Sequence, residues 1–302
     1  MPNVSSVPDD LIQPFLIEAS GLRGRLVRMG PTLREVIAKH NLSPAVKGLM
    51  AEFVILATTL SAALKFDGVF SLQAKGNGPV SLMATDVTSD GGIRAYANVP
   101  KNVSPSFVVD GSPVPRLLGA GYLAFTVDQG KHTELYQGIV DLQGATLIDC
   151  IHHYFQQSDQ LSAAITLAAG SEESEGWRGG AVMIQRLPED ELSVRKEEMD
   201  EAWRRSTILM GNCEKKELTS AKLSPHELLF RLFHEDGVRV FKTNPLHFSC
   251  RCSRERARQI ISMLSKEEIE EYKIDGRISI TCEFCNSEEW FGDAEIAAAR
   301  AT

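Results

Sequence analysis

CRC at residues 250–252 and CEFC at residues 282–285 decide how the C-terminal part of this 302-residue chain folds. Each stretch places two thiols close together, and 29 residues separate the two stretches. Two such pairs supply four soft thiolates, the ligands that tetrahedral zinc prefers, and a separation of this length lets the chain fold back to one ion. The sequence therefore predicts one zinc ion per chain, bound by Cys250, Cys252, Cys282 and Cys285.

Three alternatives remain for the same cysteines. They are four unrelated buried residues, two permanent disulfides, or a purely structural zinc site that takes part in no switch. The first two are uncommon for closely spaced cysteines in a reducing compartment. The structural zinc site is therefore the main competitor.

The residues around the cysteines predict a small module of helices and a strand. Ser253 is suited to cap a helix whose apolar residues lie at 260–264. Ser265 and Glu268 form a capping box for a second helix, and the isoleucines of 274–280 indicate a strand that leads to the second cysteine pair. A module this small has a weak core, so zinc binding, of order 10 kcal/mol, would stabilise it decisively.

Oxidation would act on this module as a switch. Four arginines, at positions 251, 254, 256 and 258, are expected to lower the pKa of the nearby thiols and favour thiolates. If an oxidant converts the thiolates to disulfides, the zinc ligands are lost and the module should unfold. A connector packed against the module would lose its support at the same moment.

Charged residues divide the chain into three parts. They number 31 in residues 1–186, 20 in the 50 residues 187–236, and 21 in residues 237–302. We therefore expect a large N-terminal domain, a charged helical linker and a small C-terminal zinc-binding module with these boundaries.

Mixed periodicities place the large domain in the α+β class. Ser43-Pro44 is a good helix start and opens an apolar, buried helix that runs through Lys65. A second, amphipathic helix is expected from residue 147 to residue 155. Period-two alternation with intervening turn signals predicts an antiparallel meander and then further strands, over residues 70–74, 80–84, 93–99, 122–127 and 135–140.

The charged linker has only a thin apolar stripe, formed by Leu192, Met199, Trp203 and Met210. Such a helix buries little surface to offset its ordering entropy, so it should be marginally stable alone. The plain interpretation is a solvated helix docked on its neighbour. The sharper hypothesis is a segment that folds or melts on a signal.

Charge and composition narrow the partners and the compartment. The net charge is −8, which argues against general binding to nucleic acid or anionic lipid. The N-terminus lacks the pattern of a secretory signal, and the most apolar stretch, residues 53–64, is shorter than the ~20 residues that a membrane span needs. We expect a cytoplasmic protein with no membrane partner.

The segments FSCRCSRER (248–256) and CEFCN (282–286) resemble the 33 kDa chaperonin family, the bacterial redox-regulated heat-shock chaperones. The resemblance covers essentially the whole chain, with weaker similarity at GNGP (76–79), DGGIRA (90–95) and GAGY (119–122). It implies an α/β N-terminal domain, a helical linker and a C-terminal zinc redox switch. One departure is Glu289-Trp290-Phe291, where the family commonly has an aromatic-x-Phe pattern.

The resemblance also implies a mechanism. Family members hold zinc on the four cysteines when they are reduced, inactive and monomeric. On oxidation they form two disulfides between neighbouring cysteines, here Cys250–Cys252 and Cys282–Cys285. The linker and switch then unfold, the protein forms a homodimer, and it binds unfolding proteins without ATP.

Two other classes of function compete with this one. A zinc enzyme is not expected, because four cysteines close the metal shell and no His-x-Glu accompanies them. A zinc-ribbon-like adaptor, facing nucleic acid, would draw support from the arginines near residue 250. His247 is a weak candidate to replace one of the cysteine ligands. His152 and His153 are expected to lie in the core or on the surface. Cys150 is expected to be a buried apolar residue, and Cys213 an exposed thiol with no role in the site.

Overall fold

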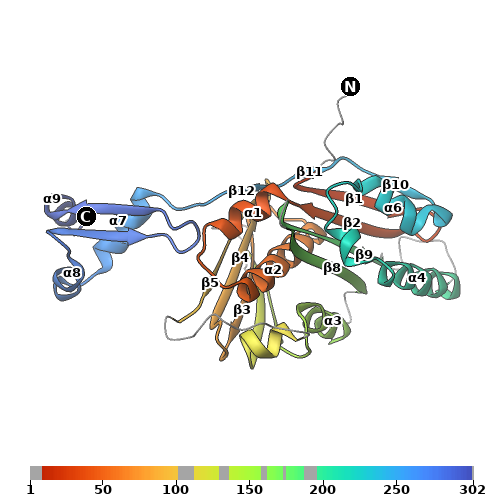
Figure 1. Ribbon diagram of the computed structural model, residues 1–302, viewed down its shortest axis with the longest axis horizontal. Helices are drawn as coiled ribbons and strands as arrows, with labels where there is room; N and C mark the ends of the chain where they lie inside the picture. Colours follow the sequence, from red (N-terminus) through yellow and green to blue (C-terminus); the bar gives the residue numbers. More distant parts are fainter. Residues whose placement is uncertain are drawn as a thin grey trace, which may run out of the picture. The chain divides into compact units, whose positions relative to one another are not determined.

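The computed structural model describes residues 9–100, 112–128, 136–157, 162–172, 175–186 and 196–300 (Figure 1). The chain forms two compact units, Met1–Phe248 and Ser249–Thr302. The first, which we call the large unit, contains two six-stranded sheets. The second, the cysteine module, contains a two-stranded sheet and three helices among the described residues. This mixed architecture confirms the α+β class.

Sheet A has the strand order β10-β1-β2-β9-β8, and β11 also pairs with β1. All of its pairings are antiparallel. Most residues of β2 and β9 are buried, because helices pack against these strands. The strands are β1 (Leu11–Ile17), β2 (Leu22–Met29), β8 (Ala163–Glu172), β9 (Gly176–Gln185), β10 (Val238–Val240) and β11 (Asn244–Pro245).

Sheet B contains the predicted meander. Its order is β12-β5-β4-β3-β6-β7, in which β3, β4 and β5 are consecutive antiparallel neighbours. The expected strands are therefore confirmed; Leu135, the first residue of the last one, lies outside the described residues. The strands are β3 (Val69–Gly76), β4 (Leu82–Thr88), β5 (Gly92–Asn98), β6 (Gly121–Asp128), β7 (Tyr136–Asp141) and β12 (His247–Phe248).

Helix α2 (Pro44–Ala63) contacts strands of both sheets and forms the centre of the large unit (Figure 1). Ser43 caps it, as predicted, by accepting a hydrogen bond from Val46 N–H. By length and composition α2 could cross a membrane, but 67% of its apolar window is buried inside the large unit, as in a core helix. α1 (Pro31–Ala38), α3 (Leu147–Gln157) and the short π-helical turn Val114–Leu118 surround this core.

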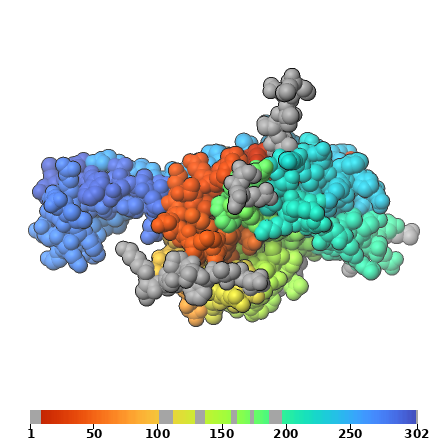
Figure 2. Space-filling view, in the orientation of Figure 1, coloured from red at the N-terminus to blue at the C-terminus, as the bar shows by residue number. Residues whose placement is uncertain are grey.

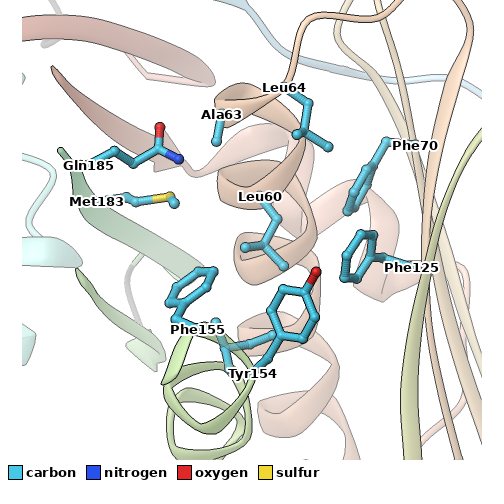
Figure 3. A pocket seen from close by; sticks show the side chains of 10 residues that line it. Leu60, Ala63, Leu64, Phe70, Phe125, Tyr154, Phe155, Met183 and Gln185 are labelled. Carbon is cyan, nitrogen blue, oxygen red and sulfur yellow. The ribbon is translucent and has the colours of Figure 1, made fainter. Parts of the chain in front are cut away.

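An apolar pocket lies where α2 and α3 meet both sheets (Figure 3). Tyr154, Phe155, Phe70 and Phe125 face it, and Gln185 brings an amide to its rim. Its volume is about 50 Å³. A cavity that holds a benzene ring is about 150 Å³, so this pocket is a packing gap and not a ligand site.

The charged linker packs on sheet A of the large unit, and its residues form much of the turquoise surface in Figure 2. Its helices are α4 (Lys196–Gly211), α5 (Lys215–Leu218) and α6 (Pro225–Phe233), followed by the 3₁₀ turn His234–Asp236. Met210 is buried and Trp203 is half-buried against the sheet, whereas Leu192 lies outside the described residues. The linker is docked on a neighbouring element, as its plain interpretation predicts: α6 adds Leu228, Leu229, Leu232 and Phe233, which pack with Phe15 and Ile17.

The segment after the linker belongs to the large unit. β10 and β11 pair with β1, and β12 pairs in parallel with β5. The cysteine module therefore begins at Ser249, whereas the sequence places this boundary at residue 237. The difference arises because residues 238–248 are held by strand pairing with distant parts of the chain, which composition does not report.

The cysteine module has its own small core. It consists of α7 (Arg254–Met263), α8 (Lys266–Tyr272), the hairpin of β13 (Arg277–Thr281) and β14 (Glu288–Gly292), and α9 (Asp293–Arg300). The predicted caps of α7 and α8, Ser253 and the Ser265 capping box, are both present. The core residues are Ala257, Ile261, Leu264, Ile269, Ile278, Ile280, Phe291, Ile296 and Ala299.

Candidate metal centre

The four C-terminal cysteines converge at one point. Their sulfur atoms all lie within 4.8 Å of one another, and all four thiols are free. Two sulfur contacts join the two sequence pairs: Cys250 and Cys282 are 3.6 Å apart, and Cys252 and Cys285 are 3.4 Å apart. Among the described residues, this is the group of potential ligands that could hold a metal ion, and it contains no histidine.

The turn between β13 and β14 presents the second pair. Cys282 directly follows the strand β13, and its N–H donates to the Ser287 carbonyl (2.9 Å). Asn286 N–H donates back to the Cys282 carbonyl (2.7 Å), with Asn286 at a φ of +56°. Asparagine tolerates this left-handed conformation better than most residues. The tight turn therefore folds the two thiols toward the same side.

The N-terminus of α7 presents the first pair. Cys250 and Cys252 precede the helix directly, and Ser253 caps it by accepting a hydrogen bond from Arg256 N–H (3.2 Å). Arg256 also donates to the Arg251 carbonyl (2.7 Å), which fixes the backbone between the two cysteines. The helix start therefore places both thiols opposite the β13–β14 turn.

Ser287 contacts two of the thiols, which sequence reasoning missed. Its hydroxyl lies 3.0 Å from Cys285 Sγ and 3.4 Å from Cys252 Sγ. The signal available in the sequence is a hydroxyl residue two positions after the last cysteine, at the start of the returning strand. A hydroxyl here can donate to a thiolate and favour its charged form.

The thiol pKa values differ within the cluster. Burial raises the pKa of Cys282 to about 12, despite hydrogen bonds from the backbone N–H groups of Cys285 and Phe284. Burial also raises the pKa of Cys285, but hydrogen bonds from Ser287 and the neighbouring thiols outweigh it and bring that pKa to about 6. For Cys252, Ser287 lowers the pKa while burial and the nearby thiols raise it, with a net increase.

Arg254, one of the four arginines near Cys250, is engaged with residues of its own module. Arg254 forms ion pairs with Glu289 (2.7 Å) and Glu295 (2.6 Å) and stacks over the Phe291 ring. Burial and hydrogen bonds are the largest influences on the thiol pKa values, not these arginines. Because Arg254 is neutralised within the module, it gives an adaptor for nucleic acid little support.

The donor set fits zinc. A Zn–S bond of about 2.3 Å in a regular tetrahedron separates the sulfurs by about 3.8 Å. The observed separations of 3.4 and 3.6 Å, with all pairs within 4.8 Å, lie around that value. Four thiolates would close the shell and leave no position for a catalytic water.

The other candidate residues lie elsewhere. Cys150 is fully buried in the core of the large unit, as predicted. Cys213 was expected to be exposed but is half-buried against the linker cluster, where burial raises the pKa of its thiol. His247 is an exposed residue of β12, and His152 and His153 are partly buried residues of α3.

Comparison with known proteins connects this site to a family. A family model described as Hsp33 protein matches residues 10–292. The 33 kDa chaperonin of Caulobacter vibrioides (strain NA1000 / CB15N) is 36% identical over 290 residues, covering 93% of this chain and 94% of the relative. The 33 kDa chaperonin of Pseudomonas fluorescens (strain SBW25) is 35% identical over 298 residues, covering 97% and 95%.

A solved structure shares the fold. The crystal structure of a 33 kDa chaperonin, a heat shock protein 33 homologue from Thermotoga maritima, matches with a TM-score of 0.80 and 21% identity, covering 97% of this chain and 98% of that one. The names of the relatives support a chaperone. Because the family model spans most of the sequence, the chain belongs to the Hsp33 protein family.

Proposed function

We propose that this chain is a redox-regulated chaperone that holds unfolding proteins without ATP and without enzymatic activity. In the reduced, inactive monomer, one zinc ion is bound by Cys250, Cys252, Cys282 and Cys285. When bound, the metal would cross-link the α7 start to the β13–β14 turn. The observation that carries the proposal is the convergence of four free thiols within 4.8 Å in a small, separate module.

Oxidation would remove the ligands. Two thiols and one hydrogen peroxide give one disulfide and two waters, so two equivalents of peroxide convert the cluster. The pairing Cys250–Cys252 and Cys282–Cys285 follows from family resemblance. In the reduced geometry all four sulfurs are close enough that local rearrangement suffices for this pairing.

Loss of the cross-link should unfold the module. Its core has nine apolar side chains, whereas other large apolar side chains of the module, including Met263 and Ile274, are exposed. Such a core provides little stability without a staple. Release of the linker would then uncover the apolar residues of sheet A for clients, and the oxidised protein would form a homodimer in the cytoplasm.

Peroxide treatment tests the switch. The reduced, zinc-loaded protein is exposed to hydrogen peroxide at elevated temperature while zinc release and the aggregation of an unrelated unfolding protein are followed. Zinc release together with suppressed aggregation is expected. Retained zinc with no gain in suppression contradicts the switch and favours an adaptor with a purely structural metal site.

Cysteine substitutions test the ligand assignment. Replacing Cys282 and Cys285 with serine should abolish stoichiometric zinc binding, because two of the four ligands are lost. The Cys150→Ala variant is the matched control and should retain one zinc per chain, since Cys150 lies buried in the other unit. Zinc content is measured by elemental analysis. Unchanged zinc in the double variant would refute the assignment.

A further inference from the structure

The segment 237–248, which we call the strap, covers the outer edge of β1. β10 and β11 pair antiparallel with this edge, so that Val240 lies opposite Phe15 and Pro245 opposite Leu11. The other edge of β1 pairs with β2. The strap therefore occupies the position of an added strand on sheet A.

Pro14 interrupts the hydrogen bonds of this edge. Phe241 N–H donates to the Pro14 carbonyl (3.0 Å), so the Pro14 backbone faces the strap. Proline has no N–H to return, and the buried side-chain amide of Gln13 donates to the Phe241 carbonyl instead (2.6 Å). Gln13 thereby supplies to a neighbouring strand the hydrogen-bond donor that Pro14 lacks.

Backbone contacts hold the middle of the strap, and its side chains contribute little. Val240 is 39% exposed and Phe241 is 50% exposed. Arg239 pairs with Glu18, and both side chains are largely exposed, so solvent screening leaves this pair a weak contribution. Backbone hydrogen bonds do not depend on sequence, so another extended segment can take the same place.

The strap leads directly into the cysteine module. Leu246 and Phe248 anchor its end in the core of the large unit, and Cys250 follows two residues later. Unfolding of the module and linker would leave the strap with flexible chain on both sides. Its weakly held middle is then the part most easily displaced.

We propose that the outer edge of β1 is a docking site for an extended segment of an unfolding protein, and that the strap is its resident occupant in the reduced chain. This inference rests on the proposed function and identifies a client surface within it. Uncovered sheet edges pair readily with other chains, which suits clients that share no common sequence. The edge offers the outward backbone groups of Ile12, Pro14 and Leu16, with Gln13 completing the donors.

A strap peptide tests the site by competition. The probe is a synthetic peptide of residues 237–246, added to the oxidised full-length chain during an aggregation assay. The matched control is the same peptide N-methylated at Arg239. In an antiparallel pair of strands, hydrogen-bonded residue pairs alternate with non-bonded ones. Phe241 N–H donates to the Pro14 carbonyl, and Glu18 N–H donates to the Gly237 carbonyl. Arg239 and Leu16 lie midway between these two bonded pairs, so they form a hydrogen-bonded pair as well.

The unmodified peptide should compete with the client, so that aggregation increases. The methylated peptide should require an about tenfold higher concentration for the same effect, as expected for one lost backbone hydrogen bond. If neither peptide competes while the oxidised chain still suppresses aggregation, or if both compete equally, strand addition is wrong. If the oxidised chain alone fails to suppress aggregation, the proposed function falls, and the docking site falls with it.

Hydrogen exchange gives a second readout on the same edge. The outward amides of Ile12 and Leu16 should exchange slowly in the reduced chain, fast in the oxidised chain without client, and slowly again in the client complex. Fast exchange at both amides in the client complex, or slow exchange in the oxidised chain before client is added, would overturn the proposal.

Discussion

The hydroxyl of Ser287 touches Cys285 and Cys252, one thiol from each sequence pair. A hydrogen bond to a thiolate stabilises its charged form, which is the form that binds metal. We therefore expect Ser287→Ala to bind zinc about 10-fold more weakly, the lower end of the effect of losing a partner of a metal ligand. Competition with a chromogenic chelator measures the change in affinity.

Ser262→Ala is the matched control for this variant. Ser262 also lies in the module, but its hydroxyl donates to the Gln259 carbonyl within α7 (2.7 Å) and contacts no cysteine. It should bind zinc as the unaltered chain does. Equal zinc affinity in both variants would show that the Ser287 contacts do not support the metal.

At this scale the sequence predicted the convergence of the four cysteines but not the side chains that surround them. The spacing of Cys250, Cys252, Cys282 and Cys285 brought all four to one point as predicted, because two close pairs on one chain have few other ways to converge. The role of Arg254 was wrong, since its partners Glu289 and Glu295 lie far along the chain. Side-chain pairing of this kind depends on packing, which local sequence does not encode.

Among the elements, β2 holds the linker through a buried arginine. Arg28 is fully buried, and its guanidinium donates to the carbonyls of Ser220 and Glu217, both in the linker. Charged hydrogen bonds of this kind contribute about 1.5–3 kcal/mol each. Arg28→Met should therefore loosen the linker in the reduced chain by about 2–3 kcal/mol, observed as faster hydrogen exchange in α5 and α6.

Arg25→Met serves as the control on the same strand. Arg25 donates to the carbonyls of Ala62 and Gly24, within the large unit and away from the linker. Its loss should leave exchange in α5 and α6 unchanged. If Arg28→Met also leaves that exchange unchanged, the apolar cluster alone holds the linker.

Helix α2 carries a carboxylate whose protonation depends on burial. Burial raises the pKa of Glu52, and the positive charge of Lys215 on α5 offsets only part of that rise. The folded chain binds the proton of Glu52 more tightly than the unfolded chain does, and this difference stabilises the fold. The stabilisation is fully present below the ordinary pKa of 4.5, and it is lost as the pH rises through the raised pKa of the folded chain. Glu52→Gln should therefore be more stable than the unaltered chain at pH 7 and equally stable near pH 4.

Urea unfolding at the two pH values measures this difference. The exposed Glu35 of α1 provides a control, because Glu35→Gln should not gain stability selectively at pH 7. A Glu52→Gln variant that is less stable at pH 7 would mean that the attraction to Lys215 outweighs the burial of the carboxylate.

The elements that the sequence predicted well are those with long, regular patterns. α2 and the β3–β4–β5 meander were expected from apolar periodicity and from turn residues such as Gly91. The strands β11 and β12 have two residues each, too few for any period, and they pair with β1 and β5 from far away in the chain. Such pairing depends on tertiary structure. It explains why the boundary expected at residue 237 differs from the division of the chain after Phe248.

For the whole molecule, stability is divided unequally between the two units. The large unit has two apolar clusters built on two sheets, whereas the cysteine module has one cluster of nine residues. The linker packs on the large unit, so its attachment does not depend on module packing alone. The proposed metal loss and linker release should therefore be separable, and reagents that remove metal without oxidising thiols can distinguish them.

Chelation under reducing conditions should unfold the module and leave the large unit folded. The proposed zinc on four thiolates would contribute of order 10 kcal/mol to a module that otherwise has a small core. Exchange of the amides of α7 and β13 should accelerate strongly on chelation, while those of α2 stay protected and no disulfide forms. Protected α7 amides in the metal-free, reduced chain would show that the module folds without metal, in which case oxidation would have to act through strain in the disulfides themselves.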